Sequence, residues 1–444
     1  MLQEPQTSSQ EQMGNGNNST QQYADIGIED AAMDNDSKTD TSFSSGNCAP
    51  KTQESQEKNT PAATDDNAAT SSDDDNNAHS QDSTATIYQD FDQISASAAR
   101  GDKDAQIALG DMYKDGKGVQ QDYKVAMDWY LQAANQGNPV GQRRIGYLHD
   151  FGLGVTQDHG KAMQWYRKSA DQGDAQAQCN IGVLFRDGEG VPQDFSKAME
   201  WFLLAAEQGN PDAQDHIGGL YYYGEGVPQD YFKASEWYRK AAEQGDPGSQ
   251  SNVGGLYRDG HGVTQDFSKA MEWYLKAADQ GHPGAQSNVG YQYRNGCGVA
   301  QDFPKAMEWF LKAADQGDAF AQYHLGGMYD EGEGVDEDVS KAMEWYRKAA
   351  DQKNSTAEYL VGYLYQNGEG VPRDCSQALE WFLKAAKQGF SQAQYTIAGL
   401  YEYGDGVPQD IEVAKEWYLK AARQGHEEAQ TRLDNLRRYE SDFY

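Results

Sequence analysis

The chain has 444 residues, of which 70 are Asp or Glu and 37 are Lys or Arg, so its formal net charge at pH 7 is −33. An acidic surface repels phosphate backbones and anionic lipid headgroups, which argues against nucleic acid and membrane surfaces as partners. Four cysteines, Cys48, Cys179, Cys297 and Cys375, show no paired spacing, which argues against both a disulfide framework and a zinc site.

The first 15 residues, MLQEPQTSSQEQMGN, lack the charged and then apolar pattern of a secretory signal, and no apolar run is long enough to span a bilayer. We therefore expect a soluble protein of the cytoplasm or nucleus.

Residues 1–86 are predicted to form a disordered acidic tail rich in Ser, Thr, Asn and Gln. This segment carries 16 Asp or Glu against 3 Lys, and Tyr23 and Phe43 are its aromatic residues. So little apolar surface cannot offset the entropy lost on ordering.

From residue 87 onward the chain repeats itself every 36 residues. The nine tryptophans fall at one fixed interval: Trp129, Trp165, Trp201, Trp237, Trp273, Trp309, Trp345, Trp381 and Trp417. Equal spacing of a large apolar residue is typical of stacked supersecondary units that share one core position. We predict an N-terminal cap helix in 87–101, nine repeats in 102–425, and a C-terminal cap helix and tail in 426–444.

The unit from Asp246 to Gly281 illustrates the two helices expected in each repeat. Asp246 and Pro247 are suited to the N-cap and first position of one helix, as are Asn138-Pro139 and Asn210-Pro211 elsewhere. Gly260 and Gly262 should end that helix, because glycine tolerates the left-handed conformation of a helix C-terminus. Asp266 should then cap the second helix.

The second helix of this unit is predicted to bury Phe267, Ala270, Met271, Trp273, Tyr274, Ala277 and Ala278, which share one helical face. Trp273 and Tyr274 should fill the space between helix pairs. Lys276 lies four residues after Glu272, which predicts a solvated ion pair.

These features combine into the pattern A-Q-x-x-[ILV]-G-x-[LM]-Y-x-x-G-x-G-V-x-Q-D-[FY]-x-K-A-M-E-W-[YF]-x-K-A-A-x-Q-G. The pattern resembles the Sel-one-like repeat, a branch of the tetratricopeptide superfamily, over about residues 102–437. The resemblance implies an all-α fold, an α-solenoid forming a right-handed superhelix, whose first helices line a concave groove. Departures are Ala398 and Lys353, each at a glycine position, and Arg373 at a glutamine position.

The same resemblance implies a non-enzymatic scaffold or adaptor that binds protein segments in the groove. Two alternatives stay open: a regulatory subunit that recruits a kinase, a ubiquitin ligase or a cell-wall synthase to clients, and a hydrolase like that reported for cysteine-rich bacterial relatives. This chain lacks the paired cysteine that those relatives carry in each unit.

Partner contacts are expected where the repeats differ from one another. One position, just before the [ILV]-G pair, includes Arg144, Asn180, His216, Asn252, Asn288 and His324. The family resemblance places asparagines there in contact with a peptide backbone, since an amide both donates and accepts hydrogen bonds. A second variable position includes Arg186, Arg258 and Arg294; with Arg143 nearby, it favours an acidic or phosphorylated ligand.

No residue pattern indicates catalysis, a cofactor or a metal. The G-x-G-V segment lies between two helices and is not followed by Lys-Ser/Thr, so it is a turn and not a phosphate loop. The eight histidines are scattered without metal-ligand spacing. The acids around Asp336 lack the spacing of a calcium loop.

Overall fold

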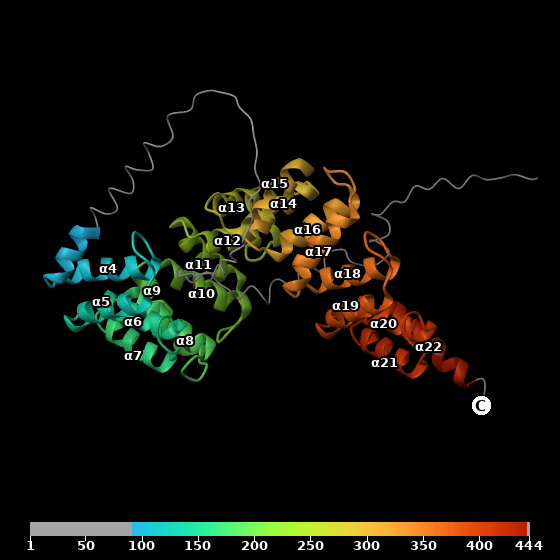
Figure 1. Cartoon of the computed structure of the whole chain (residues 1–444), viewed down its shortest axis with the longest axis horizontal. Helices are drawn as coiled ribbons and strands as arrows, with labels where there is room; N and C mark the ends of the chain where they lie inside the picture. Colours follow the sequence, from blue (N-terminus) through green and yellow to red (C-terminus); the bar gives the residue numbers. More distant parts are fainter. Residues whose placement is uncertain (1–90, 442–444) are drawn as a thin grey trace, which may run out of the picture. The chain divides into compact units, whose positions relative to one another are not determined.

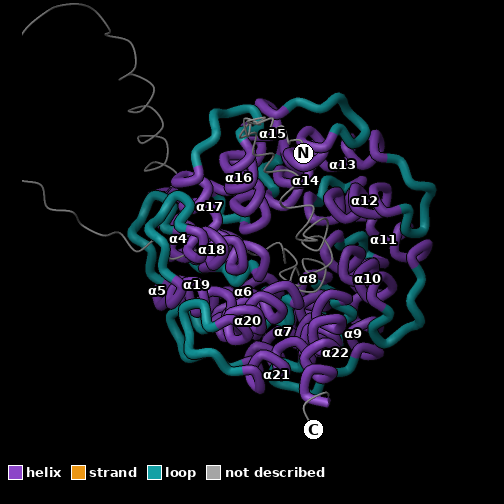
Figure 2. Tube along the Cα trace, turned by 90° about the vertical axis from the view of Figure 1, so that its right-hand side faces the viewer, coloured by secondary structure: helices purple, strands orange, loops and turns teal. Residues whose placement is uncertain are grey.

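The structure, a computed structural model, describes residues 91–441 and side chains as far as residue 438. The expected tail, 1–86, lies outside the described residues. Helices and loops make up the described chain and no strand occurs in it, as Figure 2 shows. The predicted all-α array of tandem helix pairs is confirmed.

The described chain divides into two compact units at Gln265 and Asp266. In the N-terminal unit a helix over 91–99 precedes the first repeat (Figure 1). The first helices of its repeats are α4 (Lys103–Asp115), α6 (Pro139–Phe151), α8 (Ala175–Asp187), α10 (Pro211–Tyr223) and α12 (Pro247–Asp259). The second helices are α5 (Tyr123–Asn135), α7 (His159–Ala170), α9 (Phe195–Glu207) and α11 (Tyr231–Glu243).

The C-terminal unit begins with a second helix, α13 (Phe267–Asp279). Its first helices are α14 (Pro283–Asn295), α16 (Ala319–Glu331), α18 (Ser355–Asn367) and α20 (Ser391–Tyr403). Its other second helices are α15 (Phe303–Asp315), α17 (Val339–Asp351), α19 (Cys375–Lys387) and α21 (Ile411–Ala422), and α22 (Glu427–Ser441) follows them. Within each unit, every helix packs against the helices before and after it in sequence, and α14 also contacts α16.

The predicted helix boundaries agree with the structure because they depend on local chemistry. The Asp246 carboxylate accepts from the Ser249 N–H at 2.6 Å, and Pro247 is the first residue of α12. Gly260 ends α12 with φ of 72°. A Cβ on Gly262 would lie 2.2 Å from the Tyr231 carbonyl oxygen, so this loop passes too close to α11 for any side chain.

The core of each repeat centres on the ring that follows the tryptophan. Tyr274 is 1% exposed, and its counterparts, among them Tyr166 and Phe202, are fully buried. Trp381 is 9% exposed, whereas the other tryptophans are half-buried. They pack on the rim of the core, as Trp165 does against the cluster around Ile145 and Leu148.

Two expectations for the second helix were wrong. Phe267 is 36% exposed rather than inward-facing. It lies in the first turn of α13, where its backbone carbonyl group comes close to the loop at Gly298. Lys276, which was expected to pair with Glu272, instead lies over the Trp273 ring, with Nζ 3.8 Å from the ring centroid. A cation above an indole face gains a cation–π interaction. The same Trp–Lys stack occurs at Trp237 and Trp345.

Pairs of glutamines connect the two helices of a repeat. Gln172 Nε2 donates to Gln142 Oε1 at 2.8 Å, and the same bond links Gln208 to Gln178 and Gln316 to Gln286. The acceptors are buried, so each bond satisfies a polar group that water cannot reach. These bonds tie the end of a second helix to the start of its own repeat's first helix.

Candidate functional site

The exposed side of the first helices carries most of the predicted contact residues, and we call it the first-helix face. First helices have buried positions that pack on second helices, and the remaining positions differ from repeat to repeat. In α12, for example, Val253, Gly254 and Leu256 are buried, whereas Asn252 and Arg258 are half-buried.

The three predicted asparagines are half-buried on this face. Asn180 Oδ1 accepts from Gln176 Nε2 at 3.3 Å, and Asn252 Nδ2 donates to Asp215 Oδ1 at 3.0 Å. Asn288 occupies the same position on α14 in the C-terminal unit. Asn180 and Asn252 therefore already make hydrogen bonds within the chain, and Asn180 also bonds to the Tyr166 side chain.

The two predicted histidines lie deeper than the asparagines. His216 and His324 are 5% and 6% exposed, and burial lowers the pKa of each imidazole well below its usual value. Arg186 Nη1 lies 3.2 Å from His216 Nδ1, and Arg294 Nη1 lies 3.0 Å from His324 Nδ1. Both histidines are thus neutral acceptors from an arginine of the preceding repeat, which makes them part of the packing between repeats.

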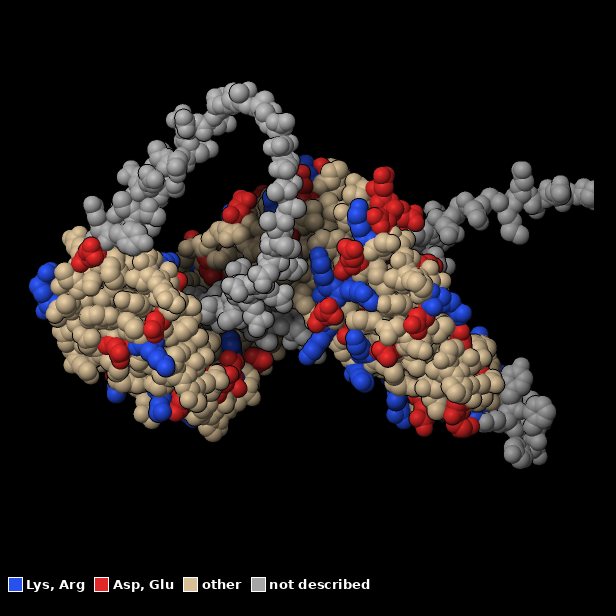
Figure 3. Space-filling view, in the orientation of Figure 1, with Lys and Arg blue, Asp and Glu red and all other residues tan. Residues whose placement is uncertain are grey.

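The predicted arginines hold carboxylates of the chain itself. Arg143 and Arg144 pair with Asp174 and Asp111 at 3.1 Å each, and Arg186 and Arg258 each pair with the aspartate that follows at 2.7 Å. Arg294 pairs with Glu331 at 3.0 Å and with Glu333 at 2.5 Å. Figure 3 shows the same mixture, with acidic and basic side chains interspersed on both units.

A buried acid missed by the sequence analysis lies between the first helices α10 and α12. Asp215 is 7% exposed and accepts from Ser249 Oγ at 2.6 Å as well as from Asn252. Burial, with Asp246 and Asp212 nearby, raises the pKa of Asp215 to about 7, against the two hydrogen bonds that lower it. The sequence shows an acid at this repeat position, but it does not show that the acid is buried, because Ser249 and Asn252 belong to the next repeat.

In the C-terminal unit the first-helix face carries an aromatic row: Tyr291, Phe320, Tyr323, Tyr359 and Tyr395. The last three share one repeat position and come from α16, α18 and α20 in turn. Tyr291 and Phe320 lie 6.1 Å apart, and Tyr359 lies 5.4 Å from Phe390. Tyr359 is buried and the others are half-buried. In the N-terminal unit the matching position holds Ile107, Arg143, Cys179, Asp215 and Ser251, none of them aromatic.

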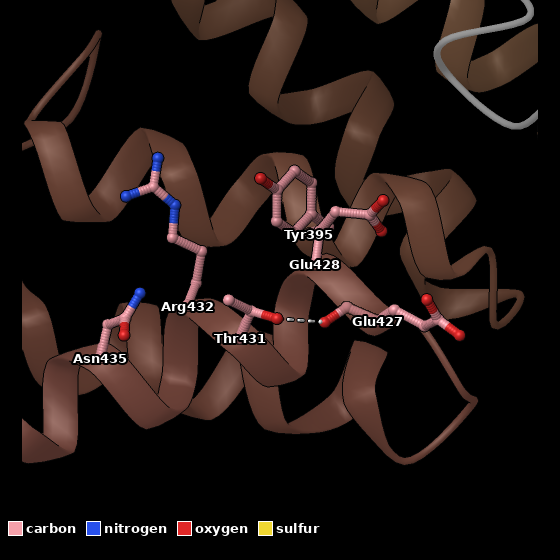
Figure 4. A pocket seen from close by; sticks show the side chains of 6 residues that line it. All are labelled: Tyr395, Glu427, Glu428, Thr431, Arg432 and Asn435. Carbon is pink, nitrogen blue, oxygen red and sulfur yellow. Dashed lines mark hydrogen bonds between the residues drawn. The ribbon is translucent and has the colours of Figure 1, made fainter.

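A shallow pocket lies at the C-terminal end of this row, between α20 and α22 (Figure 4). Tyr395 forms one side, and Glu427, Glu428, Thr431, Arg432 and Asn435 of α22 form the other. The Thr431 hydroxyl donates to the Glu427 carbonyl at 3.1 Å, which is a bond within the helix. Glu428 pairs with His426 at 3.2 Å and Arg432 lies 3.9 Å from Glu402, so the pocket offers an aromatic ring beside a guanidinium and carboxylates that already have partners in the chain.

The chemistry of a nucleophilic catalyst is lacking at the buried cysteine of the first-helix side. Cys179 is 1% exposed, and burial raises the pKa of its thiol well above the usual value. Such a thiol stays protonated and out of reach of a substrate.

Among residues 91–441, no helix combines the length and apolar character that crossing a bilayer would need.

The fold brings together three possible metal ligands that are far apart in the sequence. Asp150, His159 and Glu189 each place a donor atom within 4.8 Å of the other two. They are separated by 9 and 30 residues, so their proximity depends on how two repeats stack. These spacings match no local metal-ligand motif, so only an alignment of the 36-residue repeats could have suggested that the three residues meet.

Known proteins share this repeat architecture. The Sel1 repeat pattern matches nine consecutive segments, residues 103–138, 139–174, 175–210, 211–246, 247–282, 283–318, 319–354, 355–390 and 391–426. The chain belongs to the Sel1 repeat family. The family frame begins one residue after the frame predicted from the sequence, and proteins of this family are generally interaction scaffolds without enzymatic activity.

Two solved Sel1 repeat structures resemble the chain. The protein c5321, a protective antigen of uropathogenic Escherichia coli strains with an SLR fold, is 36% identical, with a TM-score of 0.52 over 79% of this chain and 82% of that one. A Sel1 repeat protein from Oxalobacter formigenes is 32% identical, with a TM-score of 0.50 over 71% of this chain and 93% of that one. No curated protein matches the chain in sequence.

Proposed function

We propose that this Sel1 repeat protein is a non-enzymatic scaffold that binds extended protein segments along the first-helix face. The observation that carries the proposal is the contrast between the two sides of the repeat. The ring core of the second helices recurs in every repeat, whereas the half-buried positions of the first helices change from one repeat to the next. Positions that packing does not fix are free to be selected for a partner.

The aromatic row supports an extended segment with apolar or aromatic side chains as the ligand of the C-terminal unit. Half-buried tyrosines offer large rigid contact area at low entropic cost, and such residues dominate binding energy at protein interfaces. The pocket beside Tyr395 suits one anchoring side chain at the end of that segment. Affinity would come from several modest contacts rather than one deep site.

The asparagines of the predicted row suit the backbone of an extended segment bound to either unit. Asn180, Asn252 and Asn288 follow one another at 36-residue intervals with one repeat skipped, where His216 takes the position. An amide side chain can pair with the N–H and C=O of an extended peptide irrespective of its sequence.

An acidic or phosphorylated ligand, favoured by the sequence analysis, has weaker support. Arg143, Arg144, Arg186, Arg258 and Arg294 already hold carboxylates of the chain, so an acidic ligand would have to displace each of them. Replacing one carboxylate by another gains little free energy.

Affinity capture from native lysate with the full chain as bait tests the proposal. The parent is compared with the triple variant Asn180→Ala, Asn252→Ala, Asn288→Ala and with Phe320→Ala on the aromatic row. Phe232→Ala is the control, because Phe232 is an aromatic residue 61% exposed on the second helix α11. We expect a partner that the parent and the control retain and that the first-helix variants lose. Equal retention by all four baits would contradict the proposal.

A further inference from the structure

Each repeat joins the next through a three-residue joint that recurs along the N-terminal unit. One residue lies in the last turn of a first helix, one is the first residue of the following second helix, and one lies between the two loop glycines of the next repeat. In the second repeat these are Asp150 on α6, His159 at the start of α7, and Glu189 between Gly188 and Gly190. A Cβ on Gly190 would lie 2.7 Å from the His159 Cβ, so the loop is pressed against the histidine and carries Glu189 with it.

The other joints show what usually occupies these positions. One holds Tyr222, Tyr231 and His261, in which the Tyr231 and His261 rings stack at 4.3 Å. Another, in the C-terminal unit, holds an ion pair between Arg294 and Glu333. The position of His159 is occupied by Phe195, Phe267 and Phe303 in other repeats. Asp150, His159 and Glu189 thus differ from the other joints in carrying an imidazole between two carboxylates.

The two distances from His159 to the carboxylates are close to the donor spacing around one metal ion. His159 Nδ1 lies 2.8 Å from Asp150 Oδ1 and 3.6 Å from Glu189 Oε2. Two bonds of about 2.1 Å at a tetrahedral zinc ion put the donors about 3.4 Å apart, between these two values. Binding of an ion would replace the present hydrogen bond between His159 Nδ1 and Asp150 Oδ1, and the three donors, all within 4.8 Å of one another, would adjust around it by side-chain rotation.

The surroundings of Asp150 are those of a metal ligand. Its other oxygen, Oδ2, accepts from the Tyr166 hydroxyl at 3.0 Å, which fixes the orientation of the carboxylate from an outer shell. Asp150 is largely buried, while the side chains of His159 and Glu189 are 24% and 49% exposed, which leaves the ion a path from solvent. One nitrogen and two oxygen ligands form a set that suits Zn²⁺ and neighbouring divalent transition metals.

We propose that Asp150, His159 and Glu189 bind one divalent transition-metal ion, with Zn²⁺ the best fit and water completing its coordination. The ion would hold the end of α6, the start of α7 and the loop after α8 together. The joint between the second and third repeats would then be clamped by the metal, within the N-terminal unit.

The test is Zn²⁺ titration of the full chain by calorimetry after chelator treatment, with Co²⁺ absorption spectra as a second readout of coordination. His159→Phe is the main variant, because phenylalanine occupies this joint position in other repeats. Glu189→Gln is a second variant that leaves the buried groups untouched. His261→Phe is the matched control, since His261 lies at another joint.

We expect one Zn²⁺ site in the parent and in His261→Phe, with affinity at least tenfold lower in His159→Phe and Glu189→Gln. Zn²⁺ should also raise the unfolding temperature of the parent but not that of His159→Phe. Weak binding common to all variants belongs to other acidic groups and cancels in the comparison. Isotherms for His159→Phe and Glu189→Gln that match the parent, or loss of the site in His261→Phe, would overturn the proposal.

Discussion

In most first helices a glycine near the middle of the helix lies against the buried ring of the second helix. A Cβ on Gly362 would lie 2.7 Å from the Phe382 ring, and one on Gly146 would lie 2.6 Å from the Tyr166 ring. The fully buried ring therefore requires a small residue at the facing position of the first helix. The ninth repeat has Ala398 at this position, against Tyr418.

Gly362→Ala should destabilise the chain by about 1–3 kcal/mol, because the added methyl group must displace a fully buried ring. Gly399→Ala is the control: Gly399 is also inside a first helix, but its Cβ would have no neighbour closer than the Tyr418 hydroxyl at 4.0 Å. That change should be neutral or stabilising, since alanine favours helix by about 1 kcal/mol. Urea denaturation monitored by circular dichroism distinguishes the two, and equal midpoints would contradict the account.

Asp215 should make stability depend on pH. Its folded-state pKa of about 7 exceeds the ordinary value of 3.8, so the folded chain holds the proton more tightly than the unfolded chain. The stability contributed by the protonated form is complete below about pH 4 and is lost as the pH rises to about 7.

Asp215→Asn should therefore raise the denaturation midpoint at pH 7.5 and leave it unchanged near pH 4. The asparagine Oδ1 can still accept from Ser249 and Asn252, so the contacts are kept while the charge is removed. Glu236→Gln, at an exposed position on α11, is the control for loss of one negative charge. A gain in Asp215→Asn that is equal at both pH values would show that burial of the charge is not the cause.

At the scale of helices, the ends of each element follow from residues close in sequence, which explains why they could be predicted. Asp246 and Asp266 cap α12 and α13, and Gly260 ends α12, all within a few residues of the predicted boundary. Lys353 was noted as a departure at the closing glycine after α17. It is the one non-glycine residue with positive φ, 68°, among the described residues.

Lys353→Gly should stabilise the chain by up to about 1 kcal/mol, because a side chain in the left-handed region is strained and glycine is not. The Lys353 N–H bond to the Ala350 carbonyl, 2.9 Å, would be kept. The converse change Gly317→Lys, at the same position one repeat earlier with φ of 89°, should destabilise by a similar amount. If thermal unfolding midpoints shift in the same direction for both variants, strain is not the explanation.

Contacts between repeats could not be predicted from local pattern. Arg186 and His216 are 30 residues apart, as are Arg294 and His324, and each pair forms because one repeat position meets a different position of the next repeat when the repeats stack. All four residues occupy variable positions at which partner contacts were predicted. The structure shows that variability at these positions also serves packing, because the arginine of one repeat matches the histidine of the next.

At the scale of the whole molecule, the 36-residue period predicted the class of fold without any alignment, and the family match confirms it. The period says little about the ligand, because it records what the repeats share. The candidate site lies in what they do not share: polar residues around Asp215 in one unit and the aromatic row in the other. Those differing residues form candidate binding surfaces only because the stacked helices bring the variable positions side by side.

The central claim is that partners bind the first-helix face, and hydrogen–deuterium exchange of the full chain with and without a captured partner tests it most directly. We expect slower exchange in α14, α16, α18 and α20, or in α8, α10 and α12, with exchange in the second helices unchanged. Protection confined to second helices such as α11 and α15, or to the loops, would contradict the claim.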